Sequence, residues 1–165
     1  MGDTILDVFI GRDRQLGQLQ QLFAGVGAPG ADSPGKAVLV RGRRRVGKSR
    51  LVEVFLERAD VPHVYFTASA RSAEEELRLF AAEVASSSLP GAALFADVVP
   101  GSWDAALRLL AAALPADRPS VVVLDELPYL TTADPGLEGT LQKLFDRELR
   151  RKPVLLIGIG SDLAM

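Results

Sequence analysis

The sequence predicts an α/β fold in three layers: a parallel β-sheet covered by helices on both faces. Two observations lead to this prediction. Segments with the apolar period of a strand alternate along the chain with segments that have the period of a helix. Two strand-like segments, residues 120–124 and 153–159, are almost continuously apolar, which is typical of strands buried on both faces. Helices that connect such strands give right-handed βαβ units, and ligands then bind at the carboxyl ends of the strands.

The first half of the chain predicts three helices and two strands. Leucines at positions 16, 19 and 22 recur at helical spacing. Ser72 is a good N-cap, and the three glutamates at positions 74 to 76 follow it in the first turn, where the helix dipole favours negative charge. The predicted order is a helix at residues 13–23, a turn-rich loop at 24–36, a strand at 37–41, a helix at 49–58, a strand at 61–68 and the helix capped by Ser72.

The second half predicts two helices and the two buried strands. Ser102 is expected to cap an amphipathic helix whose apolar stripe begins at Trp103. The predicted order is a loop at residues 86–101, the helix capped by Ser102, a strand at 120–124, a helix at 137–149 and a strand at 153–159.

Composition excludes several classes of protein. The 165 residues fit one domain, and the net charge of −2 gives no basic field for nucleic acid. There is no cysteine for disulfides or thiolate metal sites, and His63 is the only histidine. The N-terminus lacks the basic segment of a signal peptide, and no apolar stretch approaches the roughly 20 residues that cross a bilayer. We expect a cytoplasmic protein that does not contact a membrane.

A glycine-rich octapeptide, residues 42–49, joins the predicted strand at 37–41 to the helix at 49–58. It fits G-x-x-x-x-G-K-[ST] at every constrained position. Its glycines allow the backbone to curl so that N–H groups point at phosphate oxygens, and the following helix N-terminus adds positive potential. Lys48 is expected to reach the β- and γ-phosphates and assist catalysis, and Ser49 to bind Mg²⁺. The expected nucleotide-binding residues here are Gly42, Arg43, Arg44, Arg45, Val46, Gly47, Lys48, Ser49 and Arg50.

The arginines at positions 43 to 45 have two interpretations. They could strengthen the positive field of the phosphate site, or they could be solvated side chains that point outwards. We favour the second, because the variable positions of such a loop usually point away from phosphate.

The apolar strand at 120–124 ends in two carboxylates, Asp125 and Glu126. Asp125 is expected to hold Mg²⁺ opposite Ser49. Glu126 is expected to be the general base that polarises the attacking water. Many strands end in polar residues, so the pair alone says little. Together with the phosphate-binding loop in the correct order, it predicts an ATPase.

Four segments carry a family resemblance: Phe9-Ile10-Gly11-Arg12-Asp13, residues 42–49, Leu124-Asp125-Glu126-Leu127-Pro128-Tyr129-Leu130, and Gly160-Ser161. In combination they resemble a prokaryotic ATPase family of mainly archaeal type in the AAA+/STAND group of P-loop NTPases. The resemblance covers nearly the whole chain. It implies a core sheet of order 5-1-4-3-2 that binds ATP and Mg²⁺.

The resemblance also implies two further sets of site residues. Phe9, Ile10, Gly11 and Arg12 would lie near the adenine and ribose, unless they form only a tight turn before the first helix. Ser161 would be a polar sensor near the γ-phosphate, with Asp162 a weaker candidate and a plain strand-end turn the alternative. Tyr129 is expected to pack rather than bind, and no arginine finger can be assigned.

The chain departs from the family pattern after the fourth core strand. The family continues there into a fifth strand, a lid and often an effector domain. We therefore expect residues 1–165 to be a partial ATPase core, truncated or a partial gene product. The side of the site that binds the base would be open, and the strand before the phosphate loop would lack one neighbour and leave an unpaired edge.

The expected function is an ATP·Mg-binding core that hydrolyses ATP, slowly in this chain alone, to drive a conformational switch. The alternatives are a nucleotide-binding regulatory module that does not hydrolyse, and an ATPase subunit of a nucleic-acid-associated system. The expected partners are ATP and ADP, together with a protein partner or an effector domain outside this chain. Direct binding of nucleic acid by this segment is not expected, because its charge is acidic and aromatic and basic residues do not interleave.

Overall fold

The computed structural model describes residues 4–7, 12–27, 34–42 and 47–161. The strands are β1 (Thr4–Asp7), β2 (Lys36–Gly42), β3 (His63–Thr67), β4 (Ser120–Asp125) and β5 (Val154–Ser161). The helices are α1 (Arg12–Ala24), α2 (Lys48–Ala59), α3 (Ala73–Ala85), α4 (Trp103–Ala113), α5 (Leu127–Ala133) and α6 (Leu137–Arg147), with short 3₁₀ helices η1 (Ala92–Phe95) and η2 (Leu149–Arg151).

All five strands are parallel and lie in the order β1-β2-β5-β4-β3. Numbered from the strand before the phosphate loop, the last four strands of this sheet have the order 1-4-3-2 that the sequence predicted. The expected unpaired edge at β2 is wrong. β1 pairs with β2 over four residues, from Thr4 beside Val38 to Asp7 beside Arg41. This N-terminal strand therefore takes the position beside β2 that the sequence-based expectation left empty.

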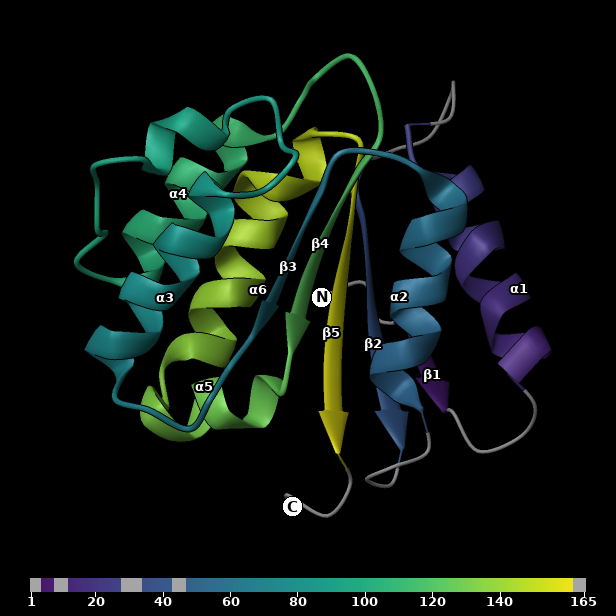
Figure 1. Cartoon of the computed structure of the whole chain (residues 1–165), viewed down its shortest axis with the longest axis horizontal. Helices are drawn as coiled ribbons and strands as arrows, with labels where there is room; N and C mark the ends of the chain where they lie inside the picture. The colour runs from purple at the N-terminus through teal and green to yellow at the C-terminus, as the bar shows by residue number, and fades with distance from the viewer. Residues whose placement is uncertain (1–3, 8–11, 28–33, 43–46, 162–165) are drawn as a thin grey trace.

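Helices cover both faces of the sheet, with α1 and α2 on one side and α3, α4 and α6 on the other (Figure 1). Because side chains alternate along a strand, each central strand contributes to both hydrophobic cores. On β4, Val121 and Val123 pack in the core beneath α1 and α2, whereas Val122 and Leu124 pack in the core beneath α3, α4 and α6. The same alternation makes Asp125 the next side chain on the α2 face.

The helix ends agree with the capping signals in the sequence. The Ser72 hydroxyl accepts a hydrogen bond from the Glu75 N–H at 3.2 Å, and the Ser102 hydroxyl accepts one from the Ala105 N–H at 3.1 Å. Each cap satisfies a backbone donor that the first turn of a helix leaves without a partner. Both predicted starts are thus confirmed.

Three local predictions differ from the structure. The expected loop at 86–101 contains η1, which buries Phe95 against Phe80 with ring centroids 6.1 Å apart. The helix expected at 137–149 ends at Arg147 and continues as η2. α5, which follows the acidic pair, was not predicted.

Candidate nucleotide-binding site

The candidate site lies at the carboxyl edge of the sheet, where the arrowheads of the strands point in Figure 1. β2 ends at Gly42, the first residue of the phosphate-binding motif, and β4 ends at Asp125. β5 lies between them and pairs Ser161 with Gly42. Parallel strands place all three ends on one edge, which is where ligands of such sheets bind.

The described part of the phosphate-binding motif consists of Gly42, which ends β2, and Gly47, Lys48 and Ser49 at the start of α2. Gly47 is the N-cap of α2 and has φ 82° and ψ 25°, a left-handed conformation that a glycine adopts without strain. Lys48 is the first residue of α2 and is only 7% exposed. Its Nζ donates a hydrogen bond to the carbonyl oxygen of Gly42 at 3.0 Å. The Lys48 side chain thus links the start of α2 to Gly42, the first residue of the motif.

Ser49 and Asp125 meet although 76 positions separate them in the sequence. The Ser49 hydroxyl donates a hydrogen bond of 2.7 Å to Oδ2 of Asp125. The other carboxylate oxygen, Oδ1, accepts the backbone N–H of Glu126 at 2.8 Å, and the Asp125 residue is 4% exposed. A hydroxyl and a carboxylate are the hard oxygen ligands that Mg²⁺ prefers. The donor set therefore fits Mg²⁺ bound together with a nucleotide.

Glu126 has a left-handed backbone, with φ 58° and ψ 40°, directly after the strand. A non-glycine residue in this region costs energy and is frequent at functional sites. Its carbonyl accepts the Tyr129 N–H at 3.0 Å, which starts α5. Glu126 is half-buried at this turn. At this turn the chain leaves the direction of β4, which ends at Asp125, and enters α5, which begins at Leu127.

Tyr65 is a site residue that sequence reasoning missed. Its hydroxyl donates a hydrogen bond to Oδ2 of Asp125 at 2.5 Å, the same oxygen that accepts from Ser49. Burial, and then the hydrogen bond to Asp125, raise the pKa of the Tyr65 phenol above its usual value, so the hydroxyl keeps its proton. The available signal was positional: Tyr65 lies on the strand expected next to Asp125 and faces the same side.

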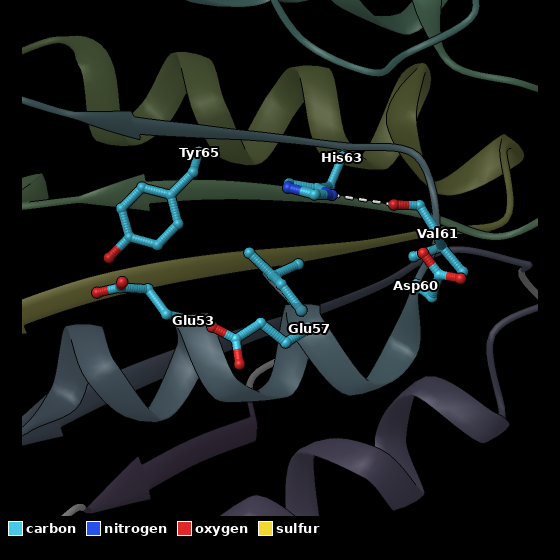
Figure 2. A pocket seen from close by; sticks show the side chains of 7 residues that line it. Glu53, Glu57, Asp60, Val61, His63 and Tyr65 are labelled. Atoms are coloured by element: carbon cyan, nitrogen blue, oxygen red, sulfur yellow. Dashed lines mark hydrogen bonds between the residues drawn. The ribbon is translucent and has the colours of Figure 1, made fainter.

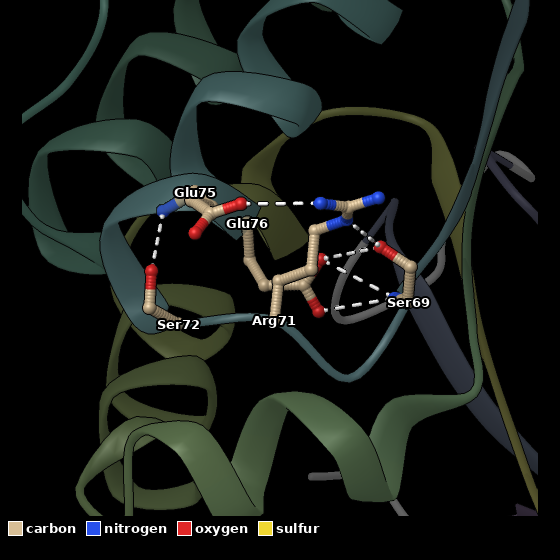
Figure 3. A network of polar contacts seen from close by, with 5 residues as sticks. All are labelled: Ser69, Arg71, Ser72, Glu75 and Glu76. Carbon is tan, nitrogen blue, oxygen red and sulfur yellow. Dashed lines mark hydrogen bonds and ion pairs between the residues drawn. The ribbon is translucent and has the colours of Figure 1, made fainter.

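A second polar network holds the turn after β3, next to Asp125 (Figure 3). The Ala68 N–H donates to the Asp125 carbonyl at 3.0 Å. Beyond it, the Ser69 N–H donates to both carboxylate oxygens of the fully buried Glu76, at 3.3 and 3.2 Å, and the Ser69 hydroxyl lies 3.3 Å from Oε1. Arg71 donates from Nε to the Ser69 hydroxyl at 3.2 Å and from a terminal nitrogen to Glu75 at 3.3 Å.

Several predicted site residues lie outside the described residues: Phe9, Ile10 and Gly11, the loop positions Arg43, Arg44, Arg45 and Val46, and Asp162. Arg12 begins α1 and Ser161 ends β5, and the structure describes the backbone of these two residues. The exposed Arg50 guanidinium extends along α2, 3.8 Å from the Glu53 carboxylate and 3.5 Å from that of Glu57. His63 opens β3, with Nδ1 2.9 Å from the Val61 carbonyl oxygen.

In the part of the chain that the structure describes, no helix is both long enough and apolar enough to cross a membrane.

Comparisons with known proteins bear on the family and the fold of the chain. The family model of the AAA ATPase domain matches residues 8–157. Among solved structures, the chain is similar to the crystal structure of Cdc6p from Pyrobaculum aerophilum, with 23% sequence identity and a TM-score of 0.59. That match covers 94% of this chain and 40% of the Cdc6p chain, so at this identity it supports the fold. No curated protein matches the chain. The chain belongs to the AAA ATPase domain family.

Proposed function

We propose that this chain binds ATP with Mg²⁺ at the carboxyl edge of the sheet and hydrolyses it. The observation that carries the proposal is the 2.7 Å hydrogen bond between Ser49 and Asp125. It joins the last residue of the phosphate-binding motif to the first residue of the acidic pair. Each motif alone could be an ordinary structural feature, such as a strand that ends in polar residues. The contact between the two motifs supports a single site.

Lys48 and the start of α2 would bind the phosphates. The Lys48 ammonium is buried and donates to a backbone carbonyl of the same loop. A phosphate oxygen is a stronger acceptor for an ammonium than a carbonyl, so the group is already in place to change partners. The N–H groups at the start of α2 add the positive end of the helix dipole. Mg²⁺, held by Ser49 with Asp125 opposite, would neutralise charge on the phosphates.

Glu126 would act as the general base. Its carboxylate would take the proton of a water molecule as the water oxygen attacks the γ-phosphorus and ADP leaves. The left-handed turn at Glu126 supports this role, because it fixes where the side chain starts relative to Asp125. Ser161, which pairs with Gly42 at the end of β5, would be the polar sensor of the γ-phosphate.

The segment Phe9-Ile10-Gly11-Arg12 would contact the base and ribose. The described elements on either side of it, β1 and α1, support this assignment. Asp7 ends β1 beside Arg41, one residue before the phosphate-binding motif, and Arg12 opens α1, which packs against α2 through the Phe23–Phe55 ring pair at 5.6 Å. The connection between β1 and α1 therefore starts at the edge of the sheet where the nucleotide would bind.

We further propose that residues 1–165 act as one ATPase core whose nucleotide state drives a conformational switch read by a protein partner or an effector domain. The chain spans 40% of the length of the Cdc6p chain that it resembles, so that protein has more chain than the matched core. A core of this kind does work only when another part of the assembly responds to the bound nucleotide.

The test combines nucleotide affinity with phosphate release. Lys48→Ala should weaken ATP·Mg²⁺ binding by about 10- to 100-fold, because it removes a charged donor from the phosphates. Glu126→Gln should keep the affinity and lower turnover by about 100-fold or more, as expected for loss of a general base. Lys143→Ala and Glu148→Gln remove partly exposed charges away from the proposed site and serve as matched controls.

The outcomes separate the alternatives. Tight binding with no phosphate release over hours would select a regulatory module that does not hydrolyse. Association with DNA that weakens steeply with salt would indicate a nucleic-acid-associated system. Unchanged affinity in Lys48→Ala, or unchanged turnover in Glu126→Gln, would refute the proposed site.

A further inference from the structure

Neither nucleotide-binding motif includes Tyr65, yet its hydroxyl reaches the centre of the site. Asp125 Oδ2 accepts two hydroxyl hydrogen bonds, from Tyr65 at 2.5 Å and from Ser49 at 2.7 Å. Asp125 Oδ1 is held separately by the backbone N–H of Glu126 at 2.8 Å. Both oxygens of this buried carboxylate therefore have fixed partners, which sets the orientation of the whole group.

The contact depends on the register of the sheet. β3 pairs Thr67 with Asp125, so Tyr65 lies two residues earlier on the same face of the sheet. Its long side chain extends along the strand to reach the carboxylate. The ring forms one wall of a cavity of about 570 Å³ between α2 and β3, with His63 on the same strand and Glu53 opposite on α2 (Figure 2). A shorter side chain at position 65 would not reach Asp125.

We propose that Tyr65 is a positioning residue that holds the Asp125 carboxylate toward Ser49, so that the pair is arranged for Mg²⁺ before nucleotide binds. The inference rests on the proposed function. Ser49 donates its one hydroxyl proton to Asp125, and its oxygen lone pairs would remain for the cation. Ser49 could therefore ligate Mg²⁺ and keep this hydrogen bond only if the carboxylate stays where it is. The Tyr65 hydroxyl holds Oδ2 in that place.

The test compares nucleotide affinity in Mg²⁺ with affinity in EDTA, using a fluorescent ADP analogue. In Tyr65→Phe the ring and its packing stay while the hydroxyl is lost. The affinity in EDTA should change less than about twofold, and the affinity in Mg²⁺ should fall about three- to tenfold, the effect of one hydrogen bond. Tyr129→Phe removes the only other tyrosine hydroxyl of the chain and should leave the ratio of the two affinities unchanged.

A double-mutant cycle tests whether Tyr65 acts through Asp125. In an Asp125→Asn background, Tyr65→Phe should change the ratio less than about twofold, because the group that Tyr65 positions is already altered. A full effect in that background would overturn the inference, since Tyr65 would then act elsewhere.

A second measurement does not require Tyr65→Phe to fold. In Tyr129→Phe protein labelled with 3-fluorotyrosine, a single ¹⁹F signal reports Tyr65. It should shift when Mg²⁺ is added to the nucleotide-bound protein, because a cation held beside Asp125 would change the charge next to the Tyr65 hydroxyl. Wild-type protein without Mg²⁺-dependent binding would overturn the proposed function and this inference together. Wild-type dependence with an unchanged ratio in Tyr65→Phe, or with no ¹⁹F shift, would overturn the inference alone.

Discussion

The buried carboxylate of Glu76 allows a quantitative test of how the turn beside Asp125 is held. Glu76 is fully buried, and both of its acceptors face the two donors of Ser69 at 3.2 to 3.3 Å. Hydrogen bonds to a charged acceptor stabilise by about 1.5–3 kcal/mol, and bonds of this length fall at the low end. In Glu76→Gln the new amide group would face the Ser69 N–H, donor against donor. We expect the free energy of unfolding to fall by about 1–2 kcal/mol, and Tm by about 3–6 °C.

The neighbouring Glu75 provides the matched control. It lies in the same first turn of α3, so Glu75→Gln loses a similar interaction with the helix dipole. Its ion pair with Arg71 is exposed and contributes little. The difference between the two variants in urea unfolding, followed by circular dichroism, therefore isolates the buried contacts. Glu76→Ala should cost more, about 3 kcal/mol, because it removes the acceptor of both Ser69 donors and opens a cavity where the buried side chain was. If Glu76→Gln is no more destabilising than Glu75→Gln, the reasoning is wrong.

Three other predictions address the core, the central strand and pH. Phe80 is fully buried, and its ring centroid lies 5.2 to 6.1 Å from those of Phe66, Phe95 and Trp103. Phe80→Leu should therefore lower the free energy of unfolding by about 2–3 kcal/mol. The control Leu79→Ala, at a side chain that is 40% exposed, should cost under about 1 kcal/mol in the same urea assay. A Cβ at Gly158 would lie 3.1 Å from Leu127 and 3.3 Å from Leu39, so Gly158→Ala should cost about 1–3 kcal/mol and reduce ATP turnover. Gly139→Ala, on α6 where the added methyl meets nothing within 4 Å, should stabilise by up to about 1 kcal/mol, and equal effects of the two glycine substitutions would contradict the packing. Because the folded state raises the pKa of Tyr65 above the ordinary value of 10.0, folding binds that proton more tightly than the unfolded chain does. Its stabilising contribution is complete below pH 10 and is lost as pH rises further, so unfolding free energy should fall more steeply above pH 10 in the wild type than in Tyr65→Phe, and parallel curves would refute this.

The sequence could predict the sheet and the meeting of the two motifs because both follow from local patterns. The apolar runs at β4 and β5 are long enough to identify buried strands, and each motif stands at a strand end. Parallel βαβ geometry then requires the strand ends to share an edge. The 2.7 Å contact between Ser49 and Asp125 is the consequence of that geometry across 76 residues.

The remaining elements depend on contacts that a local pattern does not contain. β1 has four residues and is a strand because β2 offers it a parallel edge. α5 has seven residues, two of them threonines, which are weak helix formers. The local sequence around Tyr65 indicates only a strand residue, which is half-buried in the structure. Its role could be found only after β3 was placed next to β4 in the correct register.

The glycines of β5 connect the packing of the central strand to the chemistry at its edge. β5 lies between the two strands that carry the motifs, so its side chains on the α5 face decide how closely α5 can approach. Gly158 leaves room for Leu127, and at Gly160 a Cβ would lie 3.4 Å from the Pro128 ring. Leu127 and Pro128 follow Glu126 directly, and Glu126, between β4 and α5, has a left-handed backbone. A larger residue at position 158 would push α5 outwards and relax that turn. Gly158 and Gly160 therefore help to hold the proposed catalytic residue Glu126 next to Asp125, because they let α5 pack closely on β5.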